Sequence, residues 1–278
     1  MKALIKSFPI TSFFGLTFAF TWFWWGLVYA LNLSMSAGYI PFLIGAAGPT
    51  LMAFVVSAVY GGRQEVGALW KRIRLWRVGL IWYLVALFVP TLIVLGGIGL
   101  HLLFGGALPD FKLLSQQWFL IPIALITGMF LGGPFEEEFG WRGFAIVQLQ
   151  KRYNALTASV IVGGLWGLWH LPAFLIPWSS QHNIPMVLFL LHDIALAVLF
   201  TWIFNNTGGS IWMAMVAHAA FNLTITILPI TPSAAGSTRP LAFAVALMYA
   251  IAIAVVTLFG PRTLTRNGIL RSPKTHKV

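Results

Sequence analysis

Three consecutive glutamates, Glu136, Glu137 and Glu138, lie inside an apolar stretch of a chain that has only six acidic residues. Ionisable side chains in such stretches are costly to bury and usually mark function. Glu138 and Arg142 are four residues apart, so on a helix they share a face and are predicted to form an ion pair. Glu137 points about 100° away from Glu138. It is left as a carboxylate that could take a proton from water and return it to a leaving amine.

The alternative for these glutamates is a charge network that only fixes helix packing. The sequence assigns no role to Glu136.

Two later motifs also place polar side chains one helical turn apart. In the first, Trp166 and His170 share a face, and in the second His218 and Asn222 do so. A neutral imidazole donates one hydrogen bond and a carboxamide donates two, so His218 and Asn222 could together stabilise an oxyanion. The structural alternatives are a packing histidine for His170 and interhelical hydrogen bonds for the second motif.

The composition predicts the architecture that must position these residues. The chain has 278 residues, of which 59% are hydrophobic and 8% are charged, which is typical of a polytopic membrane protein and not of a soluble domain. We expect an all-α protein whose residues 1–278 form a single integral membrane domain. Eight apolar segments are long enough to cross a bilayer, at residues 10–33, 37–60, 79–104, 118–148, 155–177, 185–204, 211–228 and 241–260.

The ionisable groups in apolar cores fall between residues 118 and 228. The sequence therefore predicts a buried polar site in spans four to seven and a catalytic core at 118–228. Counted along each helix from its predicted inner end, Glu137, His170 and His218 lie at depths of roughly 17, 24 and 14 Å, around the middle of the membrane.

The basic residues predict an orientation, because Lys and Arg gather in short cytoplasmic loops. With both termini cytoplasmic in the cell membrane, only Lys112 and Arg239 lie outside, and Arg142 stays within the membrane. The inner side then holds Lys2, Lys6, Arg63, Lys71, Arg72, Arg74, Arg77, Lys151, Arg152, Arg262, Arg266, Arg271, Lys274 and Lys277. These charges, which account for the net charge of +11, form short flanks suited to lipid headgroups. No basic domain is present that could bind nucleic acid.

Several other features narrow the chemistry. The chain has no cysteine, which excludes thiol nucleophiles and thiolate metal sites. Asp193 is expected to serve Arg142 or another buried partner, and not the adjacent His192, because neighbouring residues do not share a helical face. His101, His182 and His276 are assigned no chemistry.

Glycine and proline predict where the helices approach or break. Gly128 with Gly132, and Gly163 with Gly167, have the spacing that lets two helix backbones approach closely. Pro134 and Pro172 stand beside the polar residues and should break or kink their helices there.

The three motifs in this order, Glu137-Glu138-x-x-x-Arg142, Trp166-x-x-x-His170 and His218-x-x-x-Asn222, resemble those of the type II CAAX prenyl protease family, also called the CPBP group. The resemblance covers roughly residues 118–228. It implies an intramembrane protease site made of Glu137, His170, His218 and Asn222, supported by Glu138 and Arg142. Trp166 stands where that family usually has Phe, which keeps an aromatic ring at the position.

Two mechanisms fit these residues. In the metal-free one, Glu137 with His170 activates water, and His218 with Asn222 holds the oxyanion. In the other, Glu137, His170 and His218 bind zinc and leave one position open for water. The metal-free version is favoured, because Glu138 is expected to pair with Arg142 and the sequence has no His-Glu-x-x-His helix. The cofactor is accordingly none or zinc.

The predicted function is that of an intramembrane endopeptidase acting on a membrane-associated protein or peptide, with a prenylated CAAX protein as one substrate class. The resemblance implies access from the cytoplasmic side. Two other functions remain open. One is a proton- or cation-coupled transporter, which would predict inverted repeats. The other is a non-proteolytic bacteriocin-immunity or scaffold protein, which would keep its function without Glu137.

Overall fold

The structure is a computed structural model that describes residues 2–266. Four residues named in the sequence analysis lie outside this range: Arg271, Lys274, His276 and Lys277. The prediction of an all-α protein is confirmed, since no strand occurs in residues 2–266. The helices are α1 (Lys2–Ser7), α2 (Pro9–Ala30), α3 (Met35–Ala46), α4 (Gly48–Ile73), α5 (Leu80–Leu103), α6 (Lys112–Gln117), η1 (Trp118–Leu120), α7 (Ile121–Leu131), α8 (Pro134–Glu138), η2 (Phe139–Ile146), α9 (Val147–Leu149), α10 (Ala155–Trp169), η3 (Leu171–Leu175), α11 (Met186–Asn206), α12 (Ile211–Ile227), α13 (Pro232–Ala235) and α14 (Arg239–Phe259).

Eight helical segments are long and apolar enough to cross a membrane, as predicted. They are Pro9–Ala30, Met35–Ile73, Leu80–Leu103, Lys112–Leu149, Ala155–Leu175, Met186–Asn206, Ile211–Ala235 and Arg239–Phe259. Many large apolar side chains on their outer faces are exposed, for example Val187 on α11 and Leu92 on α5. This is the surface that lipid would cover, and the chain is a multi-pass membrane protein.

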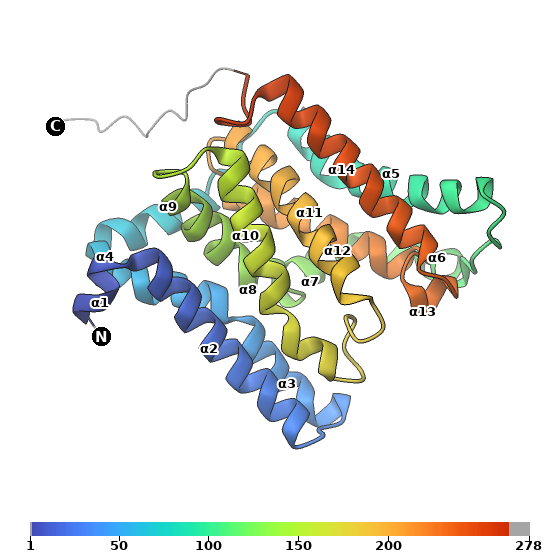
Figure 1. Cartoon of the computed structure of the whole chain (residues 1–278), viewed down its shortest axis with the longest axis horizontal. Helices are drawn as coiled ribbons and strands as arrows, with labels where there is room; N and C mark the ends of the chain where they lie inside the picture. Colours follow the sequence, from blue (N-terminus) through green and yellow to red (C-terminus); the bar gives the residue numbers. More distant parts are fainter. Residues whose placement is uncertain (1, 267–278) are drawn as a thin grey trace.

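The helices run roughly parallel and antiparallel to one another and form one bundle (Figure 1). Within it, α10 packs along α11, and α5 packs against both α12 and α14. On the other side, α2 contacts α3 and α4, and α4 contacts η2. The broken fourth span therefore lies between α4 and α12, which both contact α8 and η2.

The fourth span is broken beside the glutamates. Helix α7 ends at Leu131, and Gly133 adopts φ 108°, a conformation that side chains rarely tolerate. Pro134 then begins α8, where its missing N–H costs no hydrogen bond. Glu136 caps this helix, because the backbone N–H of Gly133 donates to its carboxylate at 3.1 Å. The predicted break at Pro134 is confirmed, and it gives Glu136 a structural role.

After α8 the chain continues as a π-helix, η2, over residues 139–146. Such wide turns are rare and often occur at functional sites. The second predicted break also occurs: α10 ends at Trp169, and Pro172 lies in the 3-10 turn η3.

Only one of the two predicted glycine pairs brings helices together. A Cβ on Gly163 would lie 2.6 Å from the Cα of Ile194, so α10 and α11 pack almost backbone to backbone. By contrast, a Cβ on Gly128 would have no neighbour within 4 Å. The expectation of close packing at Gly128 and Gly132 is therefore wrong, because those glycines lie at the exposed end of α7, next to the break.

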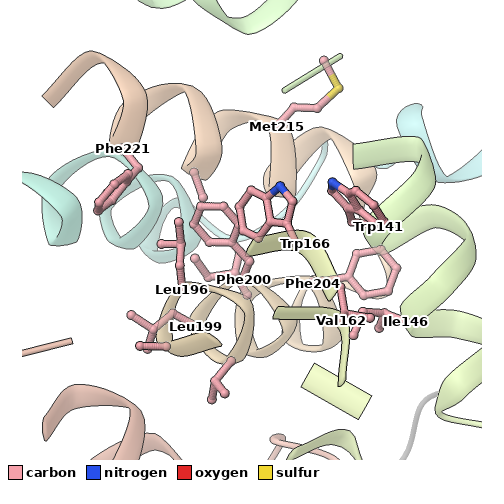
Figure 2. Packing of buried hydrophobic residues seen from close by; sticks show 14 of the residues in the cluster. Trp141, Ile146, Val162, Trp166, Leu196, Leu199, Phe200, Phe204, Met215 and Phe221 are labelled. Carbon is pink, nitrogen blue, oxygen red and sulfur yellow. The ribbon is translucent and has the colours of Figure 1, made fainter. Parts of the chain in front are cut away.

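The core between these helices is rich in aromatic rings. Figure 2 shows Trp166 beside Phe200, with Trp141 and Phe204 in the same cluster. All four are buried and come from α10, α11 and η2. The polar groups of the site are embedded among these rings.

Candidate active site

Glu137 is held by two indoles. Its side chain is 6% exposed, and its Oε2 accepts hydrogen bonds from Trp141 Nε1 at 3.0 Å and from Trp166 Nε1 at 2.6 Å. Trp141 lies one turn further along the same segment, whereas Trp166 belongs to α10. The two N–H donors fix one carboxylate oxygen. The other oxygen, Oε1, faces Gly133, whose added Cβ would lie 2.9 Å from it.

Glu138 forms the ion pair that its spacing predicted, and it has a second partner. Its Oε1 accepts from Arg142 Nη1 at 2.9 Å and lies 2.8 Å from Nδ1 of His218 on α12. Both Glu138 and Arg142 are fully buried. The Arg142 guanidinium lies over the rings of both Trp166 and Phe200, at 4.6 and 4.9 Å from their centroids. This cluster ties the fourth span to α10, α11 and α12.

His218 is oriented by this contact. An ionised carboxylate only accepts hydrogen bonds, so Nδ1 of His218 carries the hydrogen. The other ring nitrogen, Nε2, therefore provides a lone pair in the neutral ring and a donor only when both nitrogens are protonated.

His170 stands at the end of α10 and is turned toward α11. Its Nδ1 lies 3.0 Å from the carbonyl oxygen of Trp166 and 3.6 Å from Oδ2 of Asp193. A carbonyl only accepts, so Nδ1 of His170 also carries the hydrogen. Its Nε2 is then free to accept a proton, which suits a base.

Asp193 serves two histidines and makes no direct contact with Arg142. Its Oδ1 lies 2.9 Å from Nδ1 of His192, and its Oδ2 faces His170. The expectation that His192 and Asp193 do not pair is therefore wrong. Their backbone positions are about 100° apart, but rotation of the two side chains brings the ring and the carboxylate together.

Asn222 lies at the helix break. Its Nδ2 donates to the carbonyl oxygen of Gly132 at 3.1 Å. The break after α7 leaves this carbonyl without a helical partner, and Asn222 satisfies it.

Glu137, His170, His218 and Asn222 line one cavity of about 370 Å³. This volume lies within the range typical of small-molecule and peptide side-chain sites. The wall also includes Trp25 of α2 and Phe42 of α3, which belong to spans one and two. The sequence placed the polar residues of the site in spans four to seven but did not anticipate this aromatic wall.

The zinc alternative fits this arrangement poorly. Across residues 2–266, no three His, Asp or Glu side chains are grouped so as to hold one metal ion, and this includes Glu137, His170 and His218. In the carboxylate of Glu137, Oε2 already accepts hydrogen bonds from two indoles.

Two contacts of the site were not predicted from the sequence. Trp141 is four residues from Glu137, and this spacing could have identified it as a partner. The link between Asp193 and His170 has no comparable signal, because the two residues lie on different helices and meet only when α10 packs on α11.

Comparisons with known proteins bear directly on this site. Residues 117–224 match the family described as "Type II CAAX prenyl endopeptidase Rce1-like". A similar protein is "CAAX prenyl protease 2" of Methanococcus maripaludis, 30% identical over 232 residues, which are 79% of this chain and 84% of that protein. The chain belongs to the type II CAAX prenyl endopeptidase family. The predicted family is thereby confirmed, and the chain is a member of a protease family whose matched region contains every polar residue described above.

Proposed function

We propose that this protein is an intramembrane endopeptidase that hydrolyses a peptide bond of a membrane-associated polypeptide with water activated by Glu137. The observation that carries the proposal is the cavity, which gathers a carboxylate, two imidazoles and a carboxamide from the fourth span, α10 and α12. Family membership supports the peptidase activity. A transporter is not favoured, because it would need inverted repeats with matching halves, whereas the ionisable groups in apolar segments fall between residues 118 and 228.

In the proposed reaction, Glu137, assisted by His170, takes a proton from a water molecule, whose oxygen attacks the carbonyl carbon of the scissile bond. The carbonyl oxygen becomes an oxyanion that accepts a hydrogen bond from Asn222 and, when both ring nitrogens of His218 are protonated, a second one from Nε2 of His218. The C–N bond then breaks as the proton held by Glu137 passes to the leaving nitrogen. The products are a carboxylic acid and an amine, which exchange a proton to become a carboxylate and an ammonium group, and no group is oxidised or reduced.

We further propose that the protein resides in the cell membrane with both termini in the cytoplasm, following the distribution of Lys and Arg. The substrate would be a protein or peptide held at the bilayer. Prenylated CAAX polypeptides are one such class, and the name of the Methanococcus maripaludis relative refers to them.

The test is cleavage of a quenched prenylated CAAX peptide and of its unprenylated counterpart by detergent-purified protein. Each assay is repeated after chelation of metals and after addition of zinc. We expect cleavage that survives chelation and does not need zinc. Loss on chelation with recovery on zinc would overturn the metal-free mechanism. Absence of cleavage of a wider set of membrane peptides by the folded protein would favour a non-proteolytic immunity or scaffold role.

Asp193 is proposed to position His170. Asp193→Asn keeps the shape of the side chain but removes the negative charge that faces Nδ1 of His170. We expect kcat to fall by roughly 10- to 100-fold with little change in KM, because orientation of the imidazole matters in the reaction more than in binding. His192→Gln is the control, since it removes the other partner of Asp193. Equal loss in both variants, or a change in KM alone, would contradict the assignment.

A further inference from the structure

The cavity lies toward one end of the bundle. Its walls come from the last two turns of α2, the whole of α3, the last turn of α10, the first turns of α11 and the second half of α12, together with the break in the fourth span. Helices α2, α10 and α12 belong to spans one, five and seven, which run in one direction, and α3 and α11 begin spans two and six, which run in the other. All five therefore contribute from the same end, where the α2–α3 turn and residues 176–185 lie (Figure 1, lower right).

The basic residues gather at the opposite end. It contains α1, the end of α4, the segment between α9 and α10, and residues 260–266 after α14, which lie to the left and top of Figure 1. Among the described residues this end holds Lys2, Lys6, Arg63, Lys71, Arg72, Arg74, Arg77, Lys151, Arg152, Arg262 and Arg266. Among the same described residues, the only basic residues at the cavity end are Lys112 and Arg239.

Positive charges in short loops stay on the cytoplasmic side. Applied to this bundle, the rule places the cavity end on the outer side of the membrane. The family resemblance implies that the cavity is reached from the cytoplasm. This cannot be true if the basic flanks are cytoplasmic, because the cavity lies at the other end of the bundle. The charge difference is large and involves four separate flanks, so we expect it to determine the orientation.

We infer that the catalytic cavity opens on the outer face of the membrane and that the substrate is an uncharged, apolar polypeptide segment displayed there. This inference concerns the substrate of the endopeptidase proposed above and, for its activity, rests on that proposal.

The lining of the cavity supports the class of substrate. Its wall is aromatic at Trp25, Phe42 and Trp178, and its rim has neutral polar groups at Ser180 and Gln181. No Lys or Arg lines it, and its acids, Glu137 and Asp193, are engaged by indoles and imidazoles. Such a surface suits a segment that leaves the apolar core at the interface, as the end of a membrane anchor does.

The orientation can be tested without any activity, because the natural chain has no cysteine. Single cysteines are introduced at exposed residues of each end, Ser36→Cys and Asn183→Cys near the cavity and Gln64→Cys and Tyr153→Cys at the basic end. None of these changes removes a Lys or Arg, so the charge distribution is preserved. Intact cells that express each variant are treated with a membrane-impermeant maleimide, before and after permeabilisation.

We expect Ser36→Cys and Asn183→Cys to react in intact cells and the other two variants to react only after permeabilisation. The reverse pattern, or reaction of both ends in intact cells, would overturn the inference.

A second experiment measures cleavage of a membrane-impermeant quenched peptide added to intact cells and to inverted membrane vesicles. Cleavage by the Glu137→Gln variant is subtracted as the background. Cleavage by intact cells supports an outer substrate, and cleavage by inverted vesicles alone overturns it. If labelling shows the cavity end outside but neither preparation cleaves any peptide, the inference about the substrate falls together with the proposed peptidase activity, while the orientation stands.

Discussion

Replacement of Glu137 by Gln is expected to lower kcat by about 10²- to 10⁴-fold, the contribution typical of a general base. The carboxamide has nearly the shape of the carboxylate, and its oxygen can still accept from Trp141 and Trp166. The variant should therefore fold while losing the group that takes the proton from water. The measurement is kcat on a cleaved peptide, together with thermal unfolding in detergent to show that the fold is intact.

The matched control is Glu136→Gln, which removes the same charge one residue away. Glu136 only caps the backbone N–H of Gly133, and Gln can accept that hydrogen bond too. We expect its kcat to stay within a few-fold of the natural chain. If Glu137→Gln retained full activity, or if both variants lost it equally, Glu137 could not be the base.

Replacement of Arg142 by Met is expected to destabilise the fold by about 3–5 kcal/mol, the usual cost of removing one partner of a buried ion pair. Arg142 and Glu138 are both fully buried. Among the described residues, Glu138 contacts Arg142, which always carries a positive charge, and His218, which is charged only when protonated. Methionine fills much of the space that the guanidinium occupies beside Trp166 and Phe200. The loss should therefore come mainly from the stranded negative charge. It can be measured as the change in unfolding free energy in mixed micelles.

A double variant separates charge from packing. Adding Glu138→Gln to Arg142→Met removes the stranded charge, and we expect most of the lost stability to return. Activity should remain low, because Nδ1 of His218 then faces a neutral amide in place of the carboxylate that orients it. A double variant as unstable as Arg142→Met alone would show that the arginine acts through packing and not through its charge.

Much of the fold follows from local properties of the chain. The number of spans depends on apolar length, and eight segments were found near the predicted positions. The breaks at Pro134 and Pro172 depend on the missing N–H of proline, and the pair of Glu138 with Arg142 depends on helical spacing. Each of these needs only residues within a turn or a span of one another.

The partners that complete the site depend on helix packing. Trp166 reaches Glu137 across 29 residues of sequence, and His218 reaches Glu138 across 80. The contact of His170 with Asp193 and the wall formed by Trp25 and Phe42 likewise join separate spans. Periodicity indicates which residues share a face of one helix, but not which neighbour that face meets.

The sequence by itself determined that the protein is an all-helical membrane protein, which family it belongs to, and which residues are candidates for the active site. Only the tertiary structure decided that Glu137 is held by indoles, that Asp193 serves histidines, and at which end of the bundle the cavity lies. The physical reason is that hydropathy and spacing act along one helix. The direction that each side chain faces, and the space left between side chains, are set by packing all the helices at once.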